Sequence, residues 1–176
     1  MTVKRLSLLV AMAVAVISTP FVRAQTMPLD DAKLQAVQDQ CQDIQKSIID
    51  TQQSDKLARI NRGHIYETTL QLLVNFNARV ISNKVDAPEL LTITGDYQTE
   101  RKKFSELYTK YDDSITALVA MDCKPQPTEF YEKLTEIRTQ RSQLNASVAA
   151  IDSLIEKYES IVKSIRQQFP SGDKNS

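Results

Sequence analysis

Two cysteines, Cys41 and Cys123, are the residues of this chain with the best-defined chemistry. In an oxidising compartment, two cysteines of one exported chain form a disulfide. A thioredoxin-like redox centre needs two cysteines separated by two residues, and this pair is spaced far more widely. We therefore expect a structural disulfide between Cys41 and Cys123. The alternatives are two reduced, buried thiols and pairing between chains.

The start of the chain predicts that the protein is exported to an oxidising compartment. Lys4 and Arg5 precede an apolar run over residues 6–17. Pro20 and a short sequence ending at Ala24 follow, which is the pattern of a secretory signal peptide. A membrane-spanning helix needs about 20 predominantly apolar residues, so an uncleaved anchor is the less favoured alternative. We expect the signal peptide to be removed and the protein to be periplasmic or secreted.

The charge balance excludes some classes of partner. The chain has 22 Lys and Arg and 22 Asp and Glu residues, and the signal peptide carries three of the bases and no acid. The remainder is mildly acidic and has no concentrated basic patch, which argues against nucleic acid and against a polybasic membrane contact. We also expect no integral membrane segment in the mature chain, because no later stretch is long and apolar enough.

The residue types and spacings also exclude most enzyme and cofactor chemistry. His64 is the one histidine, and no spacing of His, Cys, Asp or Glu matches a zinc site or a di-iron bundle. The three glycines are not clustered, so there is no phosphate-binding loop. We expect no catalytic residues, no metal and no cofactor, and hence no enzymatic activity.

The elements that must position these residues are predicted to be long helices. Apolar residues recur in alternating steps of four and three, which is the heptad spacing of packed helices, and we call each such line of residues a seam. One seam runs from Phe130 to Phe169, a second from Leu90 to Leu118, and a weaker third from Leu34 to Phe76. The third seam includes Ile65 and Leu72, which are two of its expected core positions.

Proline and capping residues separate the seams and predict the fold. We expect an all-α antiparallel three-helix bundle or coiled coil, with helices near 28–83, 87–122 and 127–169. These form a single domain over residues 25–169, after the signal peptide at 1–24. A disordered tail is expected at 170–176, where Pro170 and Gly172 end the last helix.

Local signals leave two details of these helices to be tested. Gly63 and a polar stretch before it weaken the first helix, because glycine costs about 1 kcal/mol relative to alanine. A four-helix alternative therefore has a break near 51–63, although periodicity on both sides favours one long helix. Asp86 and Glu89 match a capping box, which predicts Asp86 as the N-cap of the second helix.

The helix boundaries place the cysteines and two charged residues in register. If the first turn lies near residue 85, Cys41 and Cys123 reach similar heights in an antiparallel hairpin. The same register brings Arg141 close to Asp55, both at seam positions. Two interpretations stay open: a polar layer between helices that fixes their register, or side chains that reach the rim with buried stems. Arg101 occupies a seam position as well.

The expected function is therefore non-enzymatic. We expect a structural or protein-interaction module of the periplasm, cell envelope or extracellular space, with another protein as its partner. Apolar residues off the seams are candidates for the contact surface unless they complete a three-helix core: Leu70, Leu73, Val80, Ile93, Leu107 and Val119. The alternative is a small-molecule or lipid binder with an apolar cavity inside the bundle, which a cavity of about several hundred cubic ångströms would favour.

Overall fold

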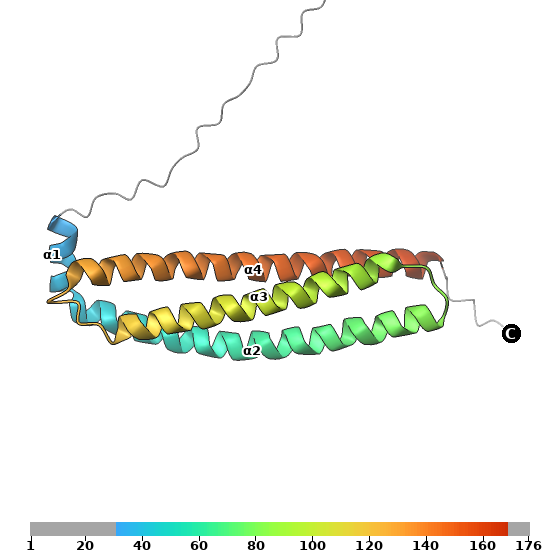
Figure 1. The fold of residues 1–176 in the computed structure, drawn as a ribbon, viewed down its shortest axis with the longest axis horizontal. Coiled ribbons are helices and arrows are strands. Elements are labelled where there is room, and N and C mark those ends of the chain that lie inside the picture. The colour runs from blue at the N-terminus through green and yellow to red at the C-terminus, as the bar shows by residue number, and fades with distance from the viewer. Residues whose placement is uncertain (1–30, 169–176) are drawn as a thin grey trace, which may run out of the picture.

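The computed structural model describes residues 31–168, and these form four α-helices with no strand among them (Figure 1). They are α1 (Asp31–Asp39), α2 (Cys41–Ser82), α3 (Pro88–Val119) and α4 (Pro127–Gln168). The predicted signal peptide at 1–24 and the predicted tail at 170–176 lie outside the described residues. The all-helical fold class is thus confirmed, whereas the expected number of three helices is wrong.

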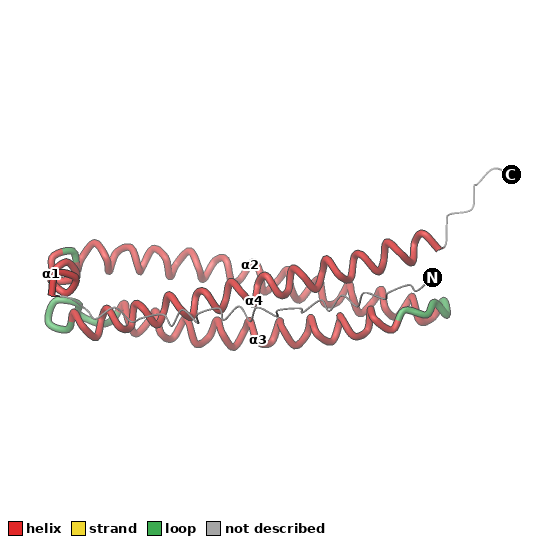
Figure 2. Tube along the Cα trace, turned by 90° about the horizontal axis from the view of Figure 1, so that it is seen from above, coloured by secondary structure: helices red, strands yellow, loops and turns green. Residues whose placement is uncertain are grey.

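Three long helices lie alongside one another, and a short one crosses their end. Short connections at 83–87 and 120–126 join α2 to α3 and α3 to α4, so neighbouring helices are antiparallel. Helix α1 stands across the end that carries the α3–α4 connection (Figure 1). Seen from above, α2 diverges from α3 and α4 toward that end (Figure 2).

The extra helix arises from a break at Gln40, where the sequence predicted none. Its backbone (φ −102°, ψ 14°) separates α1 from α2. Cys41, directly after the break, is bonded to Cys123 in the connection that follows α3, so a straight continuation of α2 would project past the end of α3. The turn instead places Val37 in the core and brings α1 against α4. The alternative break near 51–63 is wrong, because α2 is continuous through that stretch.

The turn between α2 and α3 also differs from the predicted capping. Lys84 has a left-handed backbone (φ 55°), and the amide N–H groups of Lys84 and Val85 donate to the carbonyls of Ile81 and Val80. This is a Schellman motif, which ends α2. The N-cap of α3 is Ala87 rather than Asp86, without a side-chain cap hydrogen bond, and α3 starts at a proline.

The core is densest where α3 packs along α4, the most extensive helix pair of the structure. Residues seven apart on each helix are buried, as heptad spacing predicts. On α4 these residues are Phe130, Ile137, Leu144, Ile151 and Tyr158. On α3 they are Leu90, Tyr97, Phe104, Tyr111 and Leu118.

Helix α2 is covered on the side of α3 and open on the side of α4. No Cα atom of α2 lies within 8 Å of a Cα atom of α4. The seam predicted for α2 is confirmed at Cys41 and Ile48, which are buried, but it is displaced further along, where Ile65 and Leu72 are exposed. The buried residues lie one position further on, at Tyr66 and Leu73. One residue is a rotation of about 100° on a helix, so the apolar line that faces α3 is the one that becomes buried.

A disulfide closes the end of the bundle at which α1 lies. Cys41 and Cys123 are bonded, with their Cα atoms 5.7 Å apart, and both side chains are buried. The bond joins the first turn of α2 to the connection that follows α3. It therefore holds α2 in place at the end where its helix diverges from α3 and α4.

We expect the double variant Cys41→Ala/Cys123→Ala to lose about 4 kcal/mol of unfolding free energy. The bond spans 82 residues of sequence, and an open chain of that length gains much conformational entropy in the unfolded state. Urea unfolding followed by circular dichroism measures the loss. An unfolding midpoint equal to that of the oxidised wild type would contradict this account of the bond.

Candidate functional site

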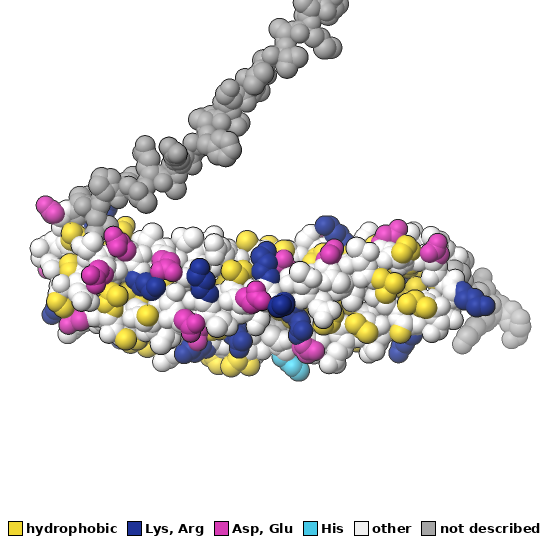
Figure 3. All heavy atoms as spheres, viewed as in Figure 1, with side chains coloured by type: hydrophobic (Ala, Val, Ile, Leu, Met, Phe, Trp, Pro, Cys, Tyr) yellow, Lys and Arg dark blue, Asp and Glu magenta, His cyan; other side chains and the backbone are white. Residues whose placement is uncertain are grey.

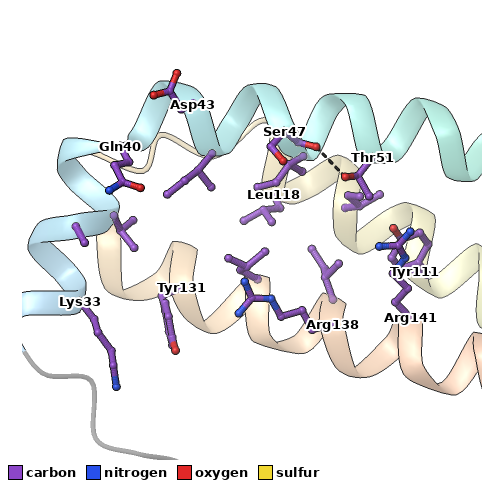
Figure 4. Close-up of a pocket in the computed structure, with 17 residues that line it drawn as sticks. Lys33, Gln40, Asp43, Ser47, Thr51, Tyr111, Leu118, Tyr131, Arg138 and Arg141 are labelled. Carbon is purple, nitrogen blue, oxygen red and sulfur yellow. Dashed lines mark hydrogen bonds between the residues drawn. The ribbon is translucent and has the colours of Figure 1, made fainter.

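The main concave site is a groove between α2 and α4 at the α1 end, which we call the proximal groove (Figure 4). It has a volume of about 610 Å³. Its apolar lining comes from all four helices: Ala36, Val37, Ile44, Ile48, Ile115, Leu118, Leu134 and Ile137. In the close-up, unlabelled aliphatic side chains fill the space between the two helices, whereas the labelled polar residues lie toward the margins.

Unequal helix lengths create this groove. Helix α3 has 32 residues, whereas α2 and α4 have 42 each. At the α1 end, α3 stops at Val119, so only its last turns reach the groove, through Tyr111, Ile115 and Leu118. Helix α1 crosses the end and contributes Val37, which closes the groove on that side.

Cationic side chains line the groove. Lys33 lies at the α1 end, and Arg138 and Arg141 lie on α4 (Figure 4). Asp43 is the acidic lining residue, and its carboxylate points away from the interior in the close-up. The groove thus combines an apolar interior with a margin that is more basic than the rest of this evenly charged chain.

An ion pair bridges α2 and α4 at the inner end of the groove. Arg141 Nη2 lies 3.0 Å from Asp55 Oδ1. The helix register inferred from the sequence predicted that these two residues lie close together. The other carboxylate oxygen, Asp55 Oδ2, accepts a hydrogen bond from the Tyr111 hydroxyl at 2.5 Å. Burial and the hydrogen bond to the Asp55 carboxylate raise the pKa of Tyr111 well above its usual value. The three side chains therefore join α2, α3 and α4 at one level.

A smaller cavity continues past this ion pair. It has a volume of about 150 Å³, and Arg141 and Tyr111 line both it and the proximal groove. Arg59 and Arg62 of α2 add two positive charges, and the Arg59 guanidinium lies 4.8 Å from the centre of the Tyr108 ring. The Tyr108 hydroxyl is buried, and no hydrogen-bond partner lies within the described part of the chain.

Arg101, the other arginine at a seam position, does not enter this site. Its guanidinium pairs with Glu67 of α2, on the side of the bundle where α2 faces α3. Its Nε is buried without a hydrogen-bond partner among the described residues. Arg101 is therefore a contact between α2 and α3, separate from the proximal groove.

A second polar layer, missed by the sequence analysis, lies near the far end of the bundle. The Asn77 amide is 4% exposed and donates to Thr94 Oγ1 at 2.8 Å. The Tyr158 hydroxyl donates to Asn77 Oδ1 at 2.7 Å, so one amide connects α2, α3 and α4. Asn77 lies off the predicted seam and is polar, so hydrophobic periodicity gives no signal for it.

The space between α2 and α4 opens again beyond this region. A cavity of about 470 Å³ there is lined by Leu72, Phe76 and Val162, together with charged residues that include Lys163 and Arg166. The Asp55–Arg141 pair and the Tyr158–Asn77 contact bridge the two helices between the proximal groove and this part of α4. The opening between α2 and α4 is therefore a series of separate cavities.

Exposed apolar side chains gather on α2. Of the eight large hydrophobic residues exposed in the described chain, seven belong to this helix. They are Ile49, Leu57, Ile60, Ile65, Leu72, Val74 and Ile81. In the surface view, apolar side chains are visible along the lower edge, where α2 lies in the matching ribbon view (Figure 3).

The apolar residues that the sequence suggested for a contact surface lie in the core or pack against it. Leu73 and Val80 are buried in the core. The others are partly buried and pack against it: Leu70, Ile93, Leu107 and Val119. They complete the packing of the bundle, which was the other interpretation of these residues.

Comparisons with protein-family models, curated proteins and solved structures find no match to this chain. Within residues 31–168, no cluster of three or more His, Cys, Asp or Glu side chains could hold a metal ion. Over the same residues, no helix has the length and apolarity needed to cross a membrane. The geometry of the groove and of α2 is therefore the basis for any functional conclusion.

Replacing Asp55 tests the three-helix contact. We expect Asp55→Ala to lower the unfolding free energy by about 1–3 kcal/mol, because the buried Tyr111 hydroxyl loses its acceptor. Asp55→Asn retains an acceptor and should cost less. Adding Tyr111→Phe to the Asp55→Ala variant should recover part of the lost unfolding free energy, as measured by urea unfolding. Equal losses for the alanine and asparagine variants would show that the hydrogen bond is not the source.

The buried tyrosines predict a loss of stability in alkali. Burial raises the pKa of five tyrosines in the folded chain: Tyr66, Tyr97, Tyr108, Tyr111 and Tyr158. Above about pH 10, the unfolded chain releases tyrosine protons that the folded chain still holds. Below that pH the tyrosines make their full contribution to the unfolding free energy, and this free energy falls as the pH rises further. Urea midpoints at increasing pH, with tyrosinate absorbance, measure this, and an unchanged midpoint would contradict it.

Proposed function

We propose that this chain is an exported, non-enzymatic interaction module of the periplasm, cell envelope or extracellular space, and that it binds another protein along α2. The observation that carries the proposal is the concentration of exposed large apolar side chains on that one helix. Leu57 and Ile60 are 66% and 63% exposed and lie three residues apart, so they project from neighbouring positions of the helix surface.

The energetics of burial support a docking role for α2. Fully burying one such side chain contributes about 1.5–3 kcal/mol relative to leaving it in water. Single exposed apolar residues are common on protein surfaces, whereas their collection on one element is typical of interaction sites. Helix α2 packs against α3 and leaves its remaining surface for a partner.

We further propose that the bundle acts as a rigid support for this surface. The three long helices form its antiparallel body, and the Asp55–Arg141 contact serves as a polar layer that fixes the register of α2 against α4. Polar groups at core positions have this role in other helical bundles. Arg141 is about half exposed, so its contribution is to alignment more than to stability.

The double variant Leu57→Gln/Ile60→Gln tests the docking surface. The oxidised mature chain is immobilised and exposed to proteins of its own compartment, and bound proteins are quantified by mass spectrometry. We expect a partner retained by the wild type to be depleted at least tenfold by the variant, because two anchoring side chains are lost.

Leu91→Gln is the matched control, since Leu91 is also exposed but lies on α3. Circular dichroism checks that all three proteins are folded. Retention of the same proteins by the α2 variant and the wild type would overturn the proposal. Sedimentation of the purified chain identifies the case in which the partner is a second copy.

The proximal groove favours a second candidate function, the binding of a small molecule or lipid. Its volume of about 610 Å³ lies within the usual range for ligand sites, about 300–1,000 Å³. Its interior is apolar and its margin carries polar and charged side chains, a combination that also occurs in such sites. This function uses the space between α2 and α4 and leaves Leu57 and Ile60 available, because neither residue lines the groove.

A further inference from the structure

We propose that the proximal groove binds a linear amphiphile with a single acyl chain and one anionic head group. The chain would lie between α2 and α4, and the head would contact Arg138 and Arg141. This inference rests on the second candidate function and names the ligand class for it. Three properties of the groove support it: its dimensions, the distribution of charge along it, and the contacts that close its two ends.

The groove has the dimensions of one extended acyl chain. Its lining on α4 runs from Tyr131 to Arg141, which is about 15 Å of helix at 1.5 Å per residue. Over this length aliphatic side chains line the space from both sides, including Ile44 of α2 and Leu134 of α4. A linear hydrocarbon can fill such a narrow space and displace water from both walls.

Charge is placed to receive an anion beside this apolar space. Arg138 and Arg141 are three residues apart and therefore lie on the same face of α4. Within the described chain, no carboxylate lies at ion-pair distance from the Arg138 guanidinium. Arg141 uses Nη2 for Asp55, and a guanidinium has five donors, so further donors can serve a ligand.

Neighbouring charges strengthen the preference for an anion. Arg59 and Arg62 line the small cavity directly beyond Arg141, and neither has a carboxylate partner at ion-pair distance in the described chain. The acidic residue that lines the groove is Asp43, which points away in the close-up, and Asp55 at the inner end is paired with Arg141. A head group at Arg138 and Arg141 therefore lies in a region of net positive charge.

The closed ends favour a short ligand over a helix of another protein. Helix α1 crosses one end of the groove, and the Asp55–Arg141 pair joins α2 to α4 at the other. The space between them corresponds to about three helical turns. A partner helix of ordinary length would have to break the ion pair or displace α1, whereas a single chain requires neither.

Isothermal titration of the oxidised wild-type protein with laurate tests the proposal, at concentrations below micelle formation. Dodecanol has the same tail without the charge and is the matched ligand. We expect laurate to bind one to one and at least tenfold more tightly than dodecanol. Across octanoate, decanoate and laurate, affinity should rise by up to about fourfold per methylene, because each one buried removes apolar surface from water.

Two variants locate the site. Arg138→Gln removes the unpaired cation, and Ser47→Trp places a large side chain on an exposed residue that lines the groove. Each should weaken laurate binding at least tenfold. Arg166→Gln removes the same charge near the other end of α4, and Ser54→Trp adds the same ring elsewhere on α2, so both should bind laurate as the wild type does.

The outcomes separate this inference from the function on which it rests. Equal affinity for laurate and dodecanol, both lost in Ser47→Trp, would overturn the anionic head while leaving a binder of apolar molecules. No binding of either ligand would overturn the inference and the binding function together. Equal losses in the groove variants and their controls, with circular dichroism unchanged, would show that laurate binds elsewhere and would also overturn the inference.

Discussion

The bond between the sulfur atoms of Cys41 and Cys123 determines where α2 begins relative to the other helices. Helix α2 contacts α3 along one side only, and its backbone stays apart from that of α4. At the α1 end, where the helices diverge, the disulfide replaces the packing that a closed bundle would have. This arrangement leaves space between α2 and α4 at the α1 end, which the proximal groove occupies.

The incomplete covering of α2 explains why one small bundle offers two kinds of surface. A three-helix core is complete when each helix buries an apolar stripe against both others. Here α3 and α4 bury theirs, whereas Ile65 and Leu72 of α2 remain exposed. The space on the α4 side becomes a series of cavities, and several large apolar side chains of α2 remain exposed. Polar contacts at Asp55 and Asn77 bridge α2 and α4 at two levels.

Heptad spacing predicted α3 and α4 well because these two helices pack against each other along their length. The same spacing located Asp55 opposite Arg141, since register depends on chain length between turns. It could not predict the break at Gln40 or the displacement from Leu72 to Leu73, because both depend on which neighbour covers α2. Heptad spacing could not predict the groove either. The groove results from unequal helix lengths, and the charged residues at its margin follow no heptad spacing.

The covalent link also changes how the chain would respond to mechanical load. Residues 41 and 123 are separated by 82 positions in sequence, yet their Cα atoms lie 5.7 Å apart. Tension applied to the two ends of the described chain would pass from α1 through the sulfur atoms and into α4. The α2–α3 hairpin, with the exposed apolar residues of α2, would carry none of it. In the oxidised protein, stretching can therefore unravel α1 and α4 while the segment proposed to meet a partner keeps its length.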